Sequence, residues 1–272
     1  MKLEKITPKQ VSRKAVPRVA RAVQRRYQDA CGAAHALELV GERWALLVMR
    51  ELMFGPRRFS DLRVALPGIS ANVLTQRLES LEASGIVERL RLPPPASVQV
   101  YGLTPWGLEA EPIFQALGRW AARSPAHDPA LPLSAVSLML SFRTMFDGRQ
   151  AQAARMTVGF VFGEETFLVR IARGALTAAR EAADAAQVTF SGTPEAVAAA
   201  VYGKVPLAVL EESGALAVAG DRAKAGRFTS LFALPAPAEV GQARRASSTS
   251  ASGATTTSAT GFPAVSKNGV RV

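Results

Sequence analysis

The stretch Phe59–Gly85, FSDLRVALPGISANVLTQRLESLEASG, decides the fold of the first part of this 272-residue chain. It holds two short helical patterns separated by Pro67-Gly68, a dipeptide that is typical of turns. Ser60 is placed to cap the first helix, and Ser70 is placed to cap the second. Gly85 follows the second helix as its stop. Two capped helices joined by a tight turn indicate a helix-turn-helix.

The patterns on both sides of this stretch identify the type of helix-turn-helix. Before it, Ala33–Phe54 has apolar residues at helical spacing and predicts one long helix. After it, Ile86–Leu92 and Val98–Leu103 read as strands around a proline-rich break, and a hairpin at this position is a wing. Thr104 then caps a further helix that runs to about Ala122. We therefore expect a mainly α winged helix domain.

These motifs resemble the HxlR-type winged helix regulators, which are relatives of the MarR group. The matching segments are Cys31, Ala36–Trp44, Leu52–Leu62, Leu66–Ser70, Val73–Leu78, Gly85–Val87 and Tyr101–Thr104. The resemblance implies a homodimer in which the second short helix enters the major groove of DNA. It also implies that each wing touches the adjacent minor groove or the backbone.

The residues that face DNA should lie near the start of the second helix, opposite its apolar residues Leu74, Leu78 and Leu81. This groove-facing set is Ser70, Asn72, Val73 and Gln76, with Arg77 reaching a phosphate or an internal acid. Asn and Gln can read adenine with two hydrogen bonds, and a helix N-terminus favours phosphate. The other phosphate candidates are Arg57, Arg58, Arg89 and Arg91. The alternative is that all of these are ordinary solvated side chains.

The formal net charge of +11 is concentrated at the N-terminus. Residues 1–30 carry a net charge of +7, whereas residues 31–125 carry only +1. We expect residues 1–17 to be a flexible basic arm that adds phosphate contacts, the alternative being a merely solvated tail. The prediction of DNA binding therefore depends on the motifs more than on net charge.

Cys31 is the single cysteine of the chain and precedes the predicted long helix. In some members of the family that the sequence resembles, a cysteine at this place senses oxidants or electrophiles. Arg25, Arg26 and the helix N-terminus would lower the pKa of its thiol and favour the thiolate. The alternative, which we favour from the sequence, is a small buried residue.

Changes in composition along the chain predict a multidomain protein. Residues 18–124 form the winged helix domain, residues 125–132 a proline-rich linker and residues 133–235 a second domain. The second domain starts with an apolar helix, followed by four strands, a helix, a strand and a helix, which predicts an α+β fold. Residues 236–272, rich in Ala, Ser, Thr and Gly, form a predicted disordered tail.

The second domain resembles the sterol carrier protein type 2 family. The matching segments are Val188–Ala196, Tyr202–Lys204, Gly214–Asp221, Phe228 and Leu231–Phe232. The resemblance implies an apolar tunnel for a lipid-like molecule between the helices and the sheet. The candidate lining residues are Met139, Phe142, Met145, Phe146, Phe160 and Phe162. Two alternatives stay open: the rings fill a solid core, or the domain only strengthens dimerisation.

The sequence holds no catalytic pattern. His35 and His127 are far apart, and hydrolase, phosphate-loop and dinucleotide motifs are missing. The carboxylate pairs Glu164-Glu165 and Glu211-Glu212 fall in predicted turns. No apolar run is long enough to span a membrane, and no secretory signal is recognisable. We therefore expect a non-enzyme without cofactor or metal.

Together these features predict a dimeric, cytoplasmic transcription regulator, a repressor, that binds double-stranded DNA. A hydrophobic small molecule in the second domain would control it, unless that domain only stabilises the dimer. The alternative function is a lipid carrier or sequestering protein whose winged helix serves as a protein-interaction module.

Overall fold

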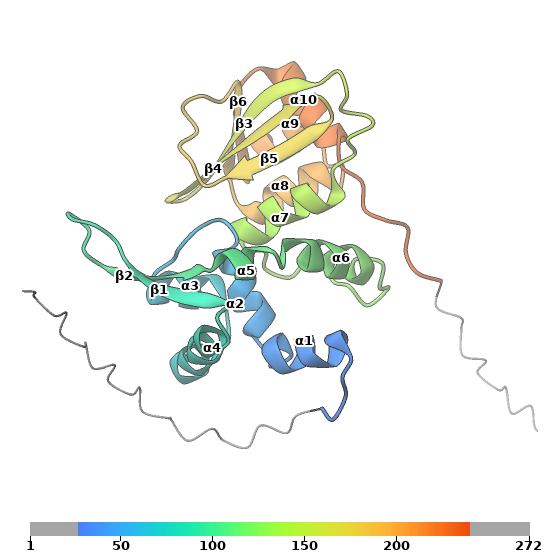
Figure 1. Cartoon of the computed structure of the whole chain (residues 1–272). Coiled ribbons are helices and arrows are strands. Elements are labelled where there is room, and N and C mark those ends of the chain that lie inside the picture. Colours follow the sequence, from blue (N-terminus) through green and yellow to red (C-terminus); the bar gives the residue numbers. More distant parts are fainter. Residues whose placement is uncertain (1–26, 240–272) are drawn as a thin grey trace, which may run out of the picture. The chain divides into compact units, whose positions relative to one another are not determined.

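The computed structural model describes residues 27–239, which are shown in colour in Figure 1. The described residues up to Ala238 belong to one compact unit. The predicted basic arm lies outside the described residues, as does almost all of the predicted tail.

The first helical segment is broken into α1 (Gly32–Val40) and α2 (Ala45–Leu52), so the prediction of one long helix was wrong. The N–H of Gly41 still donates to Leu37 O at 2.9 Å. A Cβ at this glycine would lie 2.3 Å from that oxygen, so only glycine fits here. Trp44 then takes the left-handed conformation, with φ 78°, and redirects the chain into α2.

The helix-turn-helix consists of α3 (Phe59–Ala65) and α4 (Ala71–Ala83). Ser70 caps α4 as predicted, since its hydroxyl accepts the N–H of Val73 at 3.3 Å. The prediction that Ser60 caps α3 was wrong, because the helix begins at Phe59 with Arg58 as its N-cap, two residues earlier than expected. Asp61 instead accepts the backbone N–H of Arg58 at 3.4 Å, and the hydroxyl of Ser60 donates to the same carboxylate.

The predicted wing is present as the antiparallel strands β1 (Val87–Arg91) and β2 (Gln99–Leu103). The helix predicted after Thr104 is interrupted, giving α5 (Pro105–Leu108) and α6 (Glu111–Ala121). Proline has no N–H to donate, and a proline stands in the first turn of each helix, where no such donor is needed.

The C-terminal region is a mixed sheet with helices packed on it, in agreement with the predicted α+β order (Figure 1). The strand order is β5-β4-β3-β6-β7, and only β3 and β6 run parallel. The strands are β3 (Arg155–Phe162), β4 (Glu165–Ala172), β5 (Ala175–Ala179), β6 (Val188–Gly192) and β7 (Leu216–Gly220). The helices are α7 (Ala135–Met145), α8 (Pro194–Val201), α9 (Leu207–Glu212) and α10 (Arg222–Ser230). Helix α9 was not predicted.

Side-chain caps start three of these helices. Ser134 caps α7, Thr193 caps α8 and Asp221 caps α10, each accepting a backbone N–H from the first turn. At the other end, the ammonium of Lys204 donates to Val201 O at 2.6 Å and to Thr229 O at 2.9 Å. These bonds join the C-terminal ends of α8 and α10, so Lys204 has a structural role.

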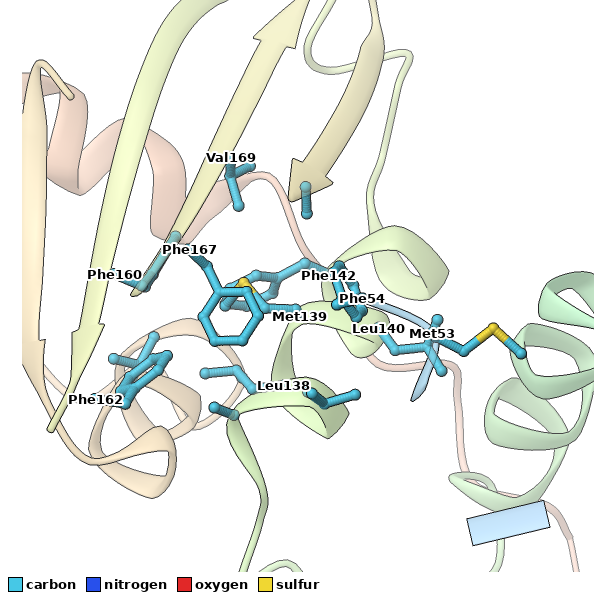
Figure 2. Close-up of a cluster of buried hydrophobic side chains, with 14 of the residues drawn as sticks. Met53, Phe54, Leu138, Met139, Leu140, Phe142, Phe160, Phe162, Phe167 and Val169 are labelled. Carbon is cyan, nitrogen blue, oxygen red and sulfur yellow. The ribbon is translucent and has the colours of Figure 1, made fainter. Parts of the chain in front are cut away.

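Helix α7 lies at the centre of the core of this region. Its side chain Phe142 is fully buried and lies 5.5 Å from Phe160 and 4.9 Å from Phe232, measured between ring centroids. Figure 2 shows Phe142 beside Met139, with Phe54 from the end of α2 in the same cluster. The buried side chains of the winged helix and of the C-terminal region thus form one continuous core.

Candidate nucleic-acid interface

Helix α4 has one buried stripe and one open polar face. Leu74, Leu78 and Leu81 are buried, as predicted. Asn72 and Gln76 are exposed on the other side, one helical turn apart. Two hydrogen-bonding amide side chains therefore stand at the N-terminal end of the helix with their donors and acceptors facing solvent.

Two further exposed residues extend this face but were missed in the sequence. Thr75 and Glu79 are both exposed and lie three and seven positions after Asn72. The helical spacing from Asn72 is the signal that would have found them. By contrast, Val73 is half-buried against the core, and the hydroxyl of Ser70 is engaged in the cap.

Two of the predicted phosphate-binding arginines are engaged inside the molecule. Arg77 pairs with Glu42 at 3.3 Å, which is the internal acid that the sequence left as its second option. The Arg57 side chain is only 10% exposed and pairs with Glu51 and Glu165. Arg57 is therefore not available to a phosphate in this structure.

The other basic candidates lie at the surface. Arg58, in front of α3, and Arg91, on the wing, are exposed. Arg89 is partly occupied, since it pairs with Glu82 at 3.1 Å and lies over the ring of Tyr101. Both wing arginines line a shallow surface hollow together with Leu90, Ser97 and Gln99.

Helix α6 exposes an apolar face. Ile113, Leu117 and Trp120 follow at helical spacing and are all exposed, Trp120 by 73%. Together with Pro112 and Ala116 they line an almost entirely apolar surface hollow. Contiguous exposed apolar side chains of this kind make the α6 face a candidate interaction surface.

Cys31 is exposed and directly precedes α1, so the prediction of a buried residue was wrong. The backbone N–H groups of Ala33 and Ala34, in the first turn of α1, hold the pKa of the thiol below its ordinary value. Arg25 and Arg26, which were expected to contribute, lie outside the described residues.

The proposed ligand-lining residues lie in the core of the C-terminal region. Met139, Phe142 and Met145 on α7 are buried, as are Phe160 and Phe162 on β3. Phe146, just after α7, is half-buried. The rings contact one another, with Phe160 stacked 5.5 Å from Phe190 and 6.0 Å from Phe162.

The carboxylate pairs are not simply solvated turns. Glu165 begins β4, and Arg57 and Arg180 both donate to it. Glu211 lies in α9 and accepts two hydrogen bonds from Arg222, whose guanidinium lowers the pKa of that carboxyl. Both carboxylates are paired because the fold brings arginines from other elements next to them.

Among residues 27–239, no three side chains of His, Cys, Asp or Glu gather closely enough to hold a metal ion. In the same part of the chain, no helix has the length and apolar character needed to cross a membrane.

Two family models match this chain. The model described as HxlR-like helix-turn-helix matches residues 39–128. The model described as alkyl sulfatase C-terminal matches residues 124–238, so the C-terminal region matches a family other than the sterol carrier proteins that its sequence resembles.

The relatives divide in the same way. The HTH-type transcriptional regulator YodB of Bacillus subtilis is 40% identical over 86 residues, which are 32% of this chain and 77% of YodB. The solved structure of reduced YodB matches at 36% identity and a TM-score of 0.33, covering 36% of this chain and 98% of that one. The sec-alkylsulfatase Pisa1 from Pseudomonas sp. matches at 22% identity and a TM-score of 0.37, covering 39% of this chain and 17% of that enzyme.

Proposed function

The chain belongs to the HxlR-like helix-turn-helix family of transcriptional regulators, and we propose that it is a dimeric repressor that reads its operator with helix α4. The observation that carries this proposal is the open polar face of α4. A helix capped by Ser70 and buried along one leucine stripe leaves Asn72 and Gln76 free for base edges.

The chemistry of this face suggests which bases it reads. Asn and Gln amides form two hydrogen bonds with adenine in the major groove, each pair contributing about 1–3 kcal/mol of discrimination. Glu79, one turn further along, can accept a hydrogen bond from the amino group of cytosine. The Glu79 carboxylate also repels the phosphates of DNA, so it disfavours non-specific binding of α4 to the DNA backbone.

Fewer arginines are available to bind the phosphates of the DNA backbone than the sequence predicts. Arg58 and Arg91 are exposed and can bind phosphates, and Arg89 can do so if it leaves Glu82. The free backbone N–H groups in the first turn of α4 can bind a phosphate as well. Arg57 and Arg77 are left out because carboxylates already occupy their guanidinium groups.

The apolar face of α6 supports the dimer. We propose that Ile113, Leu117 and Trp120 pack against the same residues of a second copy, because a twofold dimer uses one patch on both subunits. Such a dimer presents two copies of α4 to successive major grooves, about 34–36 Å apart. Bound across a promoter, it excludes other proteins from the same DNA, which is why we propose repression.

For the C-terminal region we propose a structural role, with its rings filling a solid core. The close contacts of Phe142, Phe160 and Phe190 support this interpretation over a lipid tunnel. A sterol-carrier-like ligand would have to separate these rings. Native mass spectrometry of freshly purified protein tests the proposal, and a reproducibly co-purified lipid-like molecule would contradict it.

The function itself is tested by binding selection from a random DNA pool, followed by affinity measurements at several salt concentrations. The double variant Asn72→Ala/Gln76→Ala should lose about 30-fold or more in preference for the selected site and keep its non-specific affinity. Gln152→Ala, an exposed glutamine of the C-terminal region, is the control and should bind like the wild type. An unchanged preference in the double variant would remove these residues as base readers.

A further inference from the structure

Arg57 belongs to the wing through its backbone. Its N–H donates to Tyr101 O at 2.9 Å, and the N–H of Tyr101 donates back to Arg57 O at 2.8 Å. This antiparallel bridge places Arg57 beside β2 as a short third strand. The bridge thus joins the wing to the segment between α2 and α3.

The side chain of Arg57 is held from two directions. One amino group donates to Glu51, at the end of α2, at 3.3 Å. The other donates to Glu165, which begins β4 of the C-terminal sheet. Arg57 thus joins the wing to α2, the helix that packs on α3 and α4, and to β4, whose Glu165 is 108 residues away in sequence.

Glu51 joins several parts of this arrangement. Its side chain is fully buried and accepts hydrogen bonds from Arg50 at 2.8 Å and from the hydroxyl of Ser134 at 2.7 Å, in addition to the bond from Arg57. A buried carboxylate must keep its partners, because an unpaired charge in the interior is strongly unfavourable. Ser134 is also the cap of α7, so this helix is anchored to the same carboxylate.

An aromatic contact supports the same junction. Phe54 lies edge-on to Phe167 of β4, with 5.8 Å between the ring centroids (Figure 2). Arg143 of α7 lies over Phe54 at 4.4 Å, and Arg180 lies over Phe167 at 4.7 Å. Arg180 also donates to Glu165 at 2.7 Å, which holds that carboxylate in place for Arg57.

We propose that Arg57 is a positioning residue, through which Glu165 of the C-terminal sheet sets the position of the wing. The C-terminal region then governs DNA affinity without touching DNA. The consequence for DNA rests on the proposed function, whereas the mechanical link between Glu165 and the wing does not.

The test compares two adjacent carboxylates in the full-length protein. Glu165→Ala removes one of the two carboxylate acceptors of Arg57 and leaves Glu51 in place. Glu164→Ala removes an exposed carboxylate from the preceding turn with the same change in net charge. Hydrogen exchange is followed in peptides covering residues 55–58 and 99–103, with the α4 peptide 71–83 as internal reference. Affinity for the selected DNA is measured on the same samples.

Glu165→Ala should speed exchange at residues 55–58 and 99–103, leave α4 unchanged and weaken DNA binding by about 3- to 30-fold. Glu164→Ala should match the wild type in both measurements. Unchanged exchange in Glu165→Ala would overturn the link, whatever the affinity. Faster exchange with unchanged affinity would overturn the control of DNA binding. A wild-type protein that binds no DNA would instead contradict the proposed function, and the exchange measurement would still decide the link.

Discussion

Helices α4 and α7 have similar lengths but opposite relations to solvent. Three of the 13 residues of α4 are buried, whereas eight of the 11 residues of α7 are. A helix that is apolar on almost all sides must be enclosed, while a helix with one apolar stripe leaves the rest of its surface for a partner. Helix α4 thus has a free surface for a partner, whereas α7 holds together the core of the C-terminal region.

The largest effect is expected in α7. Phe142→Ala removes a ring that contacts Phe160, Phe228 and Phe232, and should lower the free energy of unfolding by about 3–5 kcal/mol. Denaturant unfolding followed by circular dichroism measures this loss. A loss below about 1 kcal/mol would mean that the rings around Phe142 can close the space, and the contrast with α4 would weaken.

Trp120 lies at the surface, so its replacement should affect association and not folding, in contrast to Phe142. Trp120→Ala on α6 should leave the helical content unchanged and weaken dimerisation by about 2 kcal/mol or more, the usual effect of losing a central interface tryptophan. Sedimentation equilibrium measures the dimer constant. Trp106→Ala, another exposed tryptophan outside the α6 hollow, is the control, and equal effects of both changes would contradict the proposed interface.

A smaller effect distinguishes the two serines of the helix-turn-helix. Ser70→Ala removes the cap of α4 and should cost about 1 kcal/mol of stability. Ser60→Ala should cost clearly less, because the hydroxyl of Ser60 caps no helix and donates only to Asp61. Unfolding midpoints of the two variants, measured side by side, test the difference, and equal losses would contradict it.

The smallest effect concerns Cys31, at the start of α1. Because its thiol pKa is lowered by backbone N–H groups, the thiolate should form at a lower pH than in an ordinary cysteine. The rate of alkylation should therefore rise to half its maximum below the usual value of about 8.5. In urea the helix is lost, and the midpoint should return to the ordinary value. Identical midpoints in both states would contradict the lowered pKa.

Much of the winged helix was predictable because its signals are local. The cap Ser70, the leucines of α4 and the stop at Gly85 act within a few residues of one another, and the structure confirms all three. The predicted long helix failed between Val40 and Ala45, where Gly41 follows the end of α1 and Trp44 takes the left-handed conformation. The apolar spacing continues across this break, so periodicity alone did not reveal it. The apolar residues of α6 have helical spacing whether they face a core or a partner, so periodicity alone did not reveal their exposure.

The sequence by itself determined the helix-turn-helix, the wing and, apart from α9, the order of strands and helices in the C-terminal region. Hydrophobic periodicity and capping depend only on neighbours along the chain, and these are printed in the sequence. The tertiary structure alone decided the role of Arg57, which the sequence assigned to a phosphate and the fold assigns to Glu51 and Glu165. An arginine pairs with whichever carboxylate the fold brings within reach, and sequence distance says nothing about that encounter.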